Sequence, residues 1–261
     1  MKLQLAQVDA FADRVFQGNP AAICPLDDWL DDSLMQSIAT ENNLSETAYI
    51  LKIGIDQYAI RWFTPDGEVD LCGHATLATA HLLFERNLIQ GDTVSFQSKS
   101  GVLPVSRLGD GLLVMDFPAQ DFMPCEPPQH LLDGLGMPPK ETYRSMDYLV
   151  VLENQQQVIG CNPQMTSLLK LDQRGVIITA PGLECDFVSR FFGPKNGIPE
   201  DPVTGSAHCI LAPYWAKRLN KSTMHAHQVS KRGGRLICEI SGNRVFLKGG
   251  AITYMTGEIQ M

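Results

Sequence analysis

Short apolar runs bounded by turn residues recur along the whole chain, and they predict a protein rich in β-strands. The runs at 47–52 and 58–63, for example, are rich in β-branched and aromatic residues and are bounded by Gly, Asp, Asn or Pro. The same pattern predicts strands at 3–11, 93–98, 102–108, 111–117, 148–153, 175–180, 186–192, 236–241 and 244–249. Helical periodicity predicts helices at 31–42, 74–87, 163–170 and 206–219.

The segment 118–130 divides this pattern into two halves. It carries four prolines and little periodicity, which is typical of a linker. We therefore expect an N-terminal half, residues 1–117, and a C-terminal half, residues 118–261. The last strand is expected to return to the N-terminal half.

The two halves contain similar motifs in the same order. Asn19-Pro20 in the first half resembles Asn162-Pro163 in the second, and residues 72–76 (CGHAT) resemble 204–208 (TGSAH). An apolar helix is predicted to follow residues 72–76 in the first half and residues 204–208 in the second. Both helices are apolar around most of their circumference. The sequence thus predicts a diverged duplication, with two similar α/β halves that each place strands around one buried helix.

The starts of these two apolar helices are candidate anion-binding positions. The first N–H groups of a helix have no partner within the helix, and the helix dipole favours a negative charge there. Gly73 and Gly205 would let a ligand approach the backbone closely. The pattern favours a small carboxylate substrate as the partner, although two tight turns with ordinary caps would give the same sequence.

Composition and charge limit the other partners. The 261 residues are 44% hydrophobic and 19% charged, which is typical of a folded globular protein. The formal net charge of −8 argues against nucleic acid or an anionic membrane surface as the main partner. No apolar run approaches the roughly 20 residues of a membrane span.

Cofactor and metal motifs are absent from the sequence. The seven cysteines form no CxxC pair, which argues against a disulfide framework or a zinc knuckle and favours a cytoplasmic protein with free thiols. There is no GxGxxG, P-loop or GxSxG motif. We therefore expect neither a metal nor an organic cofactor.

Three residues of the first half have side chains suited to proton transfer. Glu46 directly precedes the apolar strand at 47–52, where partial desolvation would favour a role as general base. His74 lies at a helix start, which disfavours imidazolium, so a neutral ring is expected. The same helix start should lower the pKa of the Cys72 thiol. The ordinary alternatives are a surface carboxylate, a histidine near a helix cap and a buried thiol.

Four blocks of sequence resemble the PhzF (phenazine-biosynthesis-like) family. They are residues 18–22 (GNPAA), 43–48 (NLSETA), 64–76, which contains GHAT, and 200–207 (EDPVTGSA). The blocks occur in the family's order, and the resemblance spans nearly the whole chain. It implies a diaminopimelate-epimerase-like α/β (α+β) fold, in which two pseudo-symmetric halves each wrap a curved mixed β-sheet around a central helix, with the site between them.

The resemblance also implies a function and a set of site residues. It implies an isomerase that needs neither metal nor organic cofactor and shifts a proton on a small carboxylated, cyclic metabolite. On this basis Glu46 is the general base, and His74 and Asp201 assist the proton transfer. The residues expected to bind substrate are Asn19, Ser45, Gly73, Gly205 and Ser206. A homodimer is also expected.

Two other functions fit parts of the same pattern. A cofactor-independent racemase or epimerase of this fold would use two opposed thiols, and Cys72 would supply one of them. Val203 or a neighbouring residue then stands where the second thiol is expected. A non-catalytic protein that binds small molecules would need the two helix starts but no base.

Overall fold

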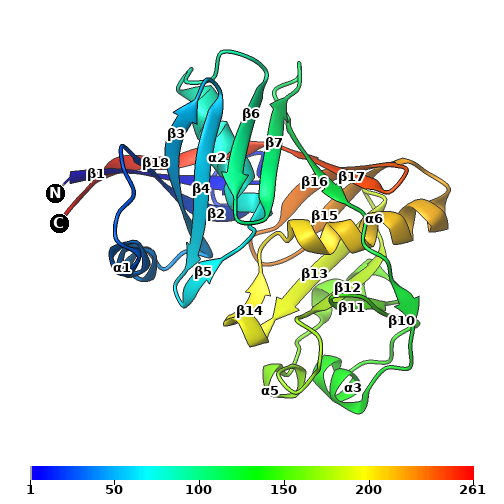
Figure 1. The fold of residues 1–261 in the computed structure, drawn as a ribbon. Coiled ribbons are helices and arrows are strands. Elements are labelled where there is room, and N and C mark those ends of the chain that lie inside the picture. Colours follow the sequence, from blue (N-terminus) through cyan, green and yellow to red (C-terminus); the bar gives the residue numbers. More distant parts are fainter. Residues whose placement is uncertain (1) are drawn as a thin grey trace. The chain divides into compact units, whose positions relative to one another are not determined.

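The computed structural model describes residues 2–261 and divides into two compact units. The first unit comprises the chain through Asp116 together with Lys248–Met261, and the second unit comprises Phe117–Leu247 (Figure 1). β18, at the C-terminal end of the chain, pairs antiparallel with β1, so the last strand completes the sheet of the first unit.

The first unit is built mostly from strands. Its elements are β1 (Lys2–Ala10), β2 (Asn19–Leu26), α1 (Asp32–Asn42), β3 (Glu46–Gly54), β4 (Gln57–Thr64), β5 (Gly67–Val69), α2 (Gly73–Glu85), β6 (Thr93–Ser98), β7 (Gly101–Arg107) and β18 (Ala251–Gln260). β8 (Leu113–Pro118) leads out of this unit, and β17 (Arg244–Gly249) leads back into it.

The second unit repeats the alternation of strands with one long helix. Its elements are β9 (Met123–Pro124), α3 (Gln129–Leu135), β10 (Glu141–Arg144), β11 (Tyr148–Val151), α4 (Gln155–Gly160), α5 (Met165–Leu168), β12 (Val176–Pro181), β13 (Phe187–Gly193), the 3₁₀ turn η1 (Pro194–Asn196), β14 (Ile198–Asp201), α6 (Gly205–Leu219), β15 (Thr223–Gln228) and β16 (Gly234–Ser241).

Strand pairing confirms the predicted duplication. In the first unit β2 and β3 are parallel, β3 and β4 antiparallel, β4 and β5 antiparallel, β4 and β6 parallel, and β6 and β7 antiparallel. β11 to β16, with α6 in place of α2, repeat the same five relations in the same order. Each unit is therefore a mixed sheet with one long helix inserted after the fourth strand of the repeat.

The two long helices are buried, as predicted. In α2 nearly every residue from His74 to Phe84 is buried, and the helix contacts β1, β2 and β3. In α6 the Trp215 ring stacks on Phe187 of β13 with centroids 5.6 Å apart, and its Nε1 donates to Thr179 Oγ1 at 3.0 Å. A helix surrounded in this way exposes little more than its ends, so the helix starts are the parts available for chemistry.

Some sequence predictions were wrong in detail. Asn162 is exposed and lies between α4 and α5, whereas Asn19 is buried at the start of β2, so the two Asn-Pro pairs are not equivalent. By pairing, the start of β2 corresponds to the start of β11 at Tyr148. The helix predicted at 163–170 is only the short α5, and α3 and α4 were not predicted. Over the described residues, no helix combines the length and the hydropathy that a bilayer span needs.

Candidate active-site groups

The start of α2 brings together four of the predicted site residues. Asn19 opens β2 and Glu46 opens β3, where Glu46 pairs with Ala21. Alternate residues of a strand share a face, so Asn19 and Ala21 lie on the face of the sheet that also carries Glu46. His74, the second residue of α2, meets both: its Nε2 lies 3.0 Å from Glu46 Oε2, and its Nδ1 lies 3.2 Å from Asn19 Nδ2.

The Glu46–His74 pair is almost completely buried. The two side chains are 11% and 7% exposed. Although Glu46 Oε2 and His74 Nε2 are close enough for an ion pair, neither atom makes a hydrogen bond of good geometry within the described chain. A buried polar atom without a partner is costly. These two atoms, which face each other beside the start of α2, are therefore candidates for contact with a ligand.

The pKa of His74 differs from the prediction. Burial opposes the charged ring, but neighbouring Cys72 and Glu46 outweigh it and hold the pKa of His74 well above its usual range. Burial, followed by the Glu46 charge, raises the pKa of the Cys72 thiol to about 11. Cys72 is therefore a neutral thiol at pH 7, which leaves Glu46 as the neighbour that raises the pKa of His74. Asn19 Nδ2 is a donor, so His74 Nδ1 accepts from it and the ring hydrogen lies on Nε2, toward Glu46. The helix-terminus argument was wrong for both residues because it left out burial and Glu46.

Ser45 joins this group through Asn19. Ser45 Oγ donates to Asn19 Oδ1 at 3.1 Å, and the amide of Asn19 contacts His74. Asn19 is fully buried. Ser45, Asn19, His74 and Glu46 therefore form one connected polar group at the start of α2. The first N–H groups of α2, from Gly73 onward, adjoin this group, and Cys72, at the N-cap position, makes no side-chain cap hydrogen bond.

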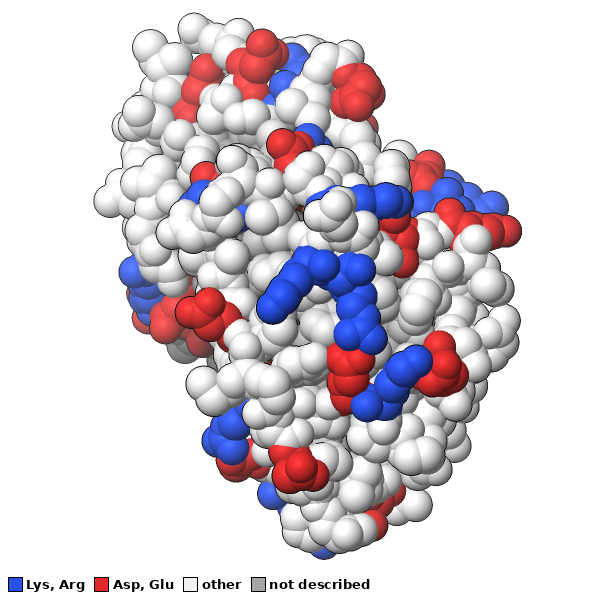
Figure 2. All heavy atoms as spheres, turned by 90° about the vertical axis from the view of Figure 1, so that its right-hand side faces the viewer, with Lys and Arg blue, Asp and Glu red and all other residues white. Residues whose placement is uncertain are grey.

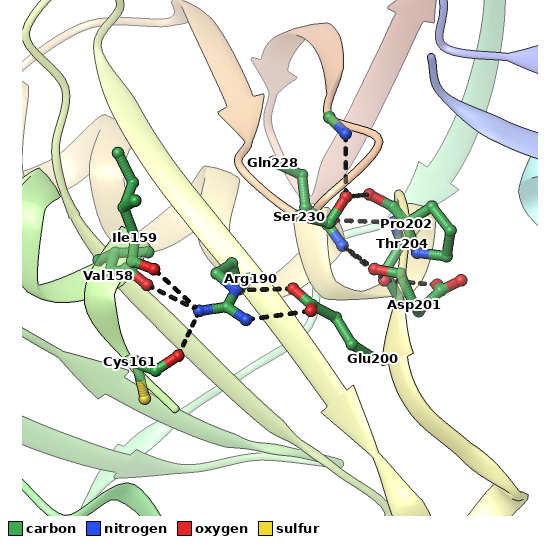
Figure 3. Close-up of polar contacts among 11 residues, drawn as sticks. Val158, Ile159, Cys161, Arg190, Glu200, Asp201, Pro202, Thr204, Gln228 and Ser230 are labelled. Atoms are coloured by element: carbon green, nitrogen blue, oxygen red, sulfur yellow. Dashed lines mark hydrogen bonds and ion pairs between the residues drawn. The ribbon is translucent and has the colours of Figure 1, made fainter. Parts of the chain in front are cut away.

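The corresponding region of the second unit holds Asp201. Asp201 is the last residue of β14 and is 8% exposed. Thr204 Oγ1 donates to its Oδ2 at 2.5 Å, and Gln228 Nε2 donates to its backbone carbonyl at 2.7 Å (Figure 3). α6 begins four residues later at Gly205, as predicted. Thr204 thus holds the side chain of Asp201 and Gln228 holds its backbone, and sequence reasoning singled out neither residue.

Ser206 is bound to a partly buried ion pair. Arg174 Nη2 donates to Ser206 Oγ at 2.9 Å, and the same guanidinium donates twice to Asp147, at 3.0 and 2.6 Å. Asp147 is fully buried. Because a guanidinium has no acceptor, Ser206 Oγ accepts this bond, and its own hydrogen remains to be donated to another group.

The duplication shows which residues of the two units are equivalent. Counting from the glycine that starts each long helix, Cys72 corresponds to Thr204, and His74 to Ser206. Val69, the last residue of β5, corresponds to Asp201. The position equivalent to Cys72 is therefore Thr204, which is a neighbour of Val203 as the sequence indicated.

One group has the composition of a metal site. Glu46, Cys72 and His74 are all buried, and each offers one ligand atom within 4.8 Å of the others. Zn²⁺ accepts such a sulfur, nitrogen and oxygen set. Because the pKa of Cys72 is raised to about 11, a metal would first have to displace the thiol proton. The expected absence of a metal stays a prediction.

The surface charges are mixed in sign on the face that Figure 2 shows. Lys and Arg side chains lie there beside Asp and Glu side chains. A nucleic-acid-binding surface has a basic patch or stripe that is not interrupted in this way. This face therefore offers no support for nucleic acid as a partner.

Comparison with known proteins first establishes the class of fold. A hydroxyproline epimerase from Agrobacterium vitis matches with a TM-score of 0.61, covering 99% of this chain and 92% of that chain, at 11% sequence identity. Identity this low shows a shared fold alone. The fold is diaminopimelate-epimerase-like, as the resemblance implied.

Closer similarities then establish the family. The model of the phenazine biosynthesis-like protein family (PhzC-PhzF) matches residues 8–257. An uncharacterized isomerase of Pseudomonas aeruginosa is 51% identical over 262 residues, covering 100% of both chains. The crystal structure of a PhzF-family phenazine biosynthesis protein from Enterococcus faecalis matches with a TM-score of 0.97 at 46% identity, covering 100% of both chains. The chain belongs to the PhzF family, and its relatives support an isomerase-type enzyme.

Proposed function

We propose that this protein is an isomerase that moves a proton on a small carboxylated, cyclic metabolite without a metal or an organic cofactor. The buried Glu46–His74 pair is the main support. It places a carboxylate, which accepts a proton, 3.0 Å from Nε2 of an imidazole ring, which donates one. Both facing atoms lack a hydrogen bond of good geometry within the described residues. A substrate placed against them would supply the missing partners and receive general acid–base catalysis.

The proposed reaction breaks one C–H bond and forms another. Glu46 accepts the proton from a substrate carbon, and the electron pair moves into the conjugated system of the ring. A proton then returns to a different carbon of that system, from His74 or from Asp201. The product has the same composition as the substrate, which is the definition of an isomerisation.

Negative charge builds up on the substrate while the proton is away. Backbone N–H groups that are already in place stabilise such charge without reorganising. In the first unit we assign this role to the start of α2 at Gly73, with Asn19 and Ser45 as polar side chains that bind substrate. In the second unit we assign it to the start of α6 at Gly205, with Ser206.

The two-thiol epimerase mechanism is less well supported. Cys72 is buried, its pKa is raised to about 11, and the equivalent residue of the second unit is Thr204. An unactivated hydroxyl does not replace a thiolate as the base that removes a proton from carbon. A protein that only bound a carboxylate would have no use for a buried carboxylate beside the helix start, because that charge would repel the ligand.

Deuterium uptake from heavy water tests the proposed function. Carboxylated cyclic metabolites are incubated with the enzyme in D₂O, with and without exhaustive chelation, and analysed by mass spectrometry and NMR. We expect one of them to gain deuterium at carbon and to be converted to an isomer, equally fast with chelator present. If conversion required an added metal, the cofactor-independent mechanism would be excluded. A homodimer and a cytoplasmic location remain predictions.

A further inference from the structure

Gln228 is a fully buried polar residue that the proposed mechanism does not yet use. It ends β15, opposite Ser189 of β13, while Asp201 ends β14, opposite Phe191 of the same strand. Because residues two apart on a strand share a face, Gln228 and Asp201 lie on one face of the sheet. β15 and β14 thus bring the two residues together beside β13.

The hydrogen bonds around Gln228 have only one consistent direction. Thr204 N–H can only donate, and it bonds Gln228 Oε1 at 2.9 Å. The amide nitrogen must therefore be Nε2, which donates to the Asp201 carbonyl at 2.7 Å and to Thr204 Oγ1 at 3.2 Å. Figure 3 shows Gln228 directed at both residues.

This direction fixes the hydrogen of the Thr204 hydroxyl. Since Thr204 Oγ1 accepts from Gln228, its single hydrogen is available for Asp201 Oδ2, which lies 2.5 Å away. Hydrogen bonds to a charged group are among the stronger hydrogen bonds in proteins. The same contact prevents the carboxylate from rotating about its Cβ–Cγ bond.

We propose that Thr204 and Gln228 are positioning residues that hold the Asp201 carboxylate in the orientation needed for proton transfer. The inference rests on the proposed function, in which Asp201 exchanges a proton with the substrate. Gln228 binds Thr204 at both its N–H and its hydroxyl, and Thr204 also precedes the first residue of α6. One buried amide therefore sets the place of Asp201 relative to the helix start that is proposed to bind the substrate carboxylate.

The equivalent residue of the first unit supports this assignment. Cys72 also precedes its helix, and its Sγ lies 3.5 Å from His74 Nδ1. In each unit, then, the residue before the long helix contacts the proposed proton-transfer group of that unit. The second unit uses a hydroxyl for this contact, which allows a directed hydrogen bond to a carboxylate.

Thr204 variants test the role of the hydroxyl. Thr204→Val keeps the shape and removes the hydrogen bond, whereas Thr204→Ser keeps the hydroxyl. Ser230→Ala is the matched control, because Ser230 Oγ donates to the Pro202 carbonyl of the same loop at 2.8 Å. Gln228→Met is a second test that leaves the Thr204 side chain intact, should Thr204→Val fail to fold.

The first measurement needs no substrate. The side-chain carboxyl ¹³C signal of Asp201 is assigned by its loss in Asp201→Asn and is followed in each variant at neutral pH. We expect the signal to move in Thr204→Val and Gln228→Met, and to stay near its wild-type position in Thr204→Ser and Ser230→Ala. An unmoved signal in Thr204→Val and Gln228→Met would overturn the inference and leave the role of Glu46 untouched.

The second measurement uses the substrate found by deuterium uptake. Loss of a hydrogen bond to a charged group should lower kcat about 10- to 100-fold in Thr204→Val, with KM changed much less. Thr204→Ser should recover most of the activity, and Ser230→Ala should retain it. Wild-type kcat in Thr204→Val, despite a moved ¹³C signal, would show that Asp201 needs no positioning for the reaction and would refute the proposal.

Discussion

The first turns of α2 and α6 occupy equivalent places in two units of the same topology, yet the surroundings of their histidines shift the pKa in opposite directions. The pKa of His74 is well above its usual range, while burial lowers the pKa of His208 to about 4. Both rings are buried, and within the described residues the hydrogen-bond partner of His208 Nδ1 is the Thr204 carbonyl, 2.8 Å away. His74 has Glu46. The nearby carboxylate distinguishes the surroundings of His74, the second residue of α2, from those of His208, the fourth residue of α6.

The same comparison shows how two similar units differ in chemistry. The last residue of β5 is Val69, while the equivalent last residue of β14 is Asp201. Conversely, Glu46 opens β3, while the residue that opens β12 is Val176. Each unit therefore carries one proposed proton-transfer carboxylate, but at a different point of the shared topology. A repeated scaffold with acids at non-equivalent positions suits a reaction in which the proton leaves one carbon and returns to another.

The largest expected effect comes from removing the two carboxylates together. Glu46→Gln and Asp201→Asn should each lower kcat by about 10²- to 10⁴-fold, the usual loss for an acid or base group. If both groups act on one substrate, kcat of the double variant should be only slightly lower than kcat of the less active single variant, because the effects of groups that work as a unit are not additive. If the two fold-losses in kcat instead multiplied in the double variant, the two residues would act independently.

Removal of the His74 side chain should change stability in a pH-dependent way. Because its folded pKa is raised, His74 stabilises the protein fully below its unfolded pKa of about 6.5, and the effect disappears as pH rises through the folded pKa. His74→Gln should therefore lower the free energy of unfolding by about 3–5 kcal/mol near pH 6, as for a broken buried pair. Urea unfolding at several pH values measures this. A deficit that grew with rising pH would contradict the assignment.

The second histidine should give the opposite pH dependence. The folded pKa of His208, about 4, lies below its unfolded value of 6.5, so its stabilising effect is present above pH 6.5 and is lost as pH falls toward 4. The loss should amount to about 3 kcal/mol. His208→Gln should flatten this part of the stability–pH curve. An unchanged slope between pH 6.5 and 4 would show that His208 is not a buried neutral ring.

The smallest effect is expected at Cys72. Cys72→Ala should lower kcat only a few-fold, through lost packing beside His74. The thiol is buried with a pKa raised to about 11, so iodoacetamide should react with it slowly in the folded protein. Complete loss of activity in Cys72→Ala, together with rapid inactivation by iodoacetamide, would favour the two-thiol epimerase instead.

The sequence predicted those parts of the site that depend on local patterns. Glycine before an apolar run correctly placed the starts of α2 and α6, and strand patterning placed Glu46 at the opening of β3. The two Asn-Pro pairs were misleading, because a dipeptide carries too little information to fix its place in a repeat. Only strand pairing showed that Asn162 is not equivalent to Asn19.

Properties that arise from distant contacts could not be read from the sequence. The raised pKa of His74 depends on Glu46, which is 28 residues earlier in the sequence but 3.0 Å away in space. Gln228 and Arg174 contact Thr204 and Ser206 from other strands and loops, and neither belongs to a recognisable motif. Their roles follow from which strands lie side by side, and local propensity does not determine that.

The most direct test of the account is the rate of deuterium incorporation at substrate carbon by Glu46→Gln. Glutamine keeps the shape of the side chain beside His74 but removes its basicity, and Glu41→Gln on the exposed side of α1 is the matched control. We predict that the control exchanges at the wild-type rate while Glu46→Gln is slower by about 10²- to 10⁴-fold. Deuterium incorporation by Glu46→Gln at the wild-type rate would show that Glu46 is not the base.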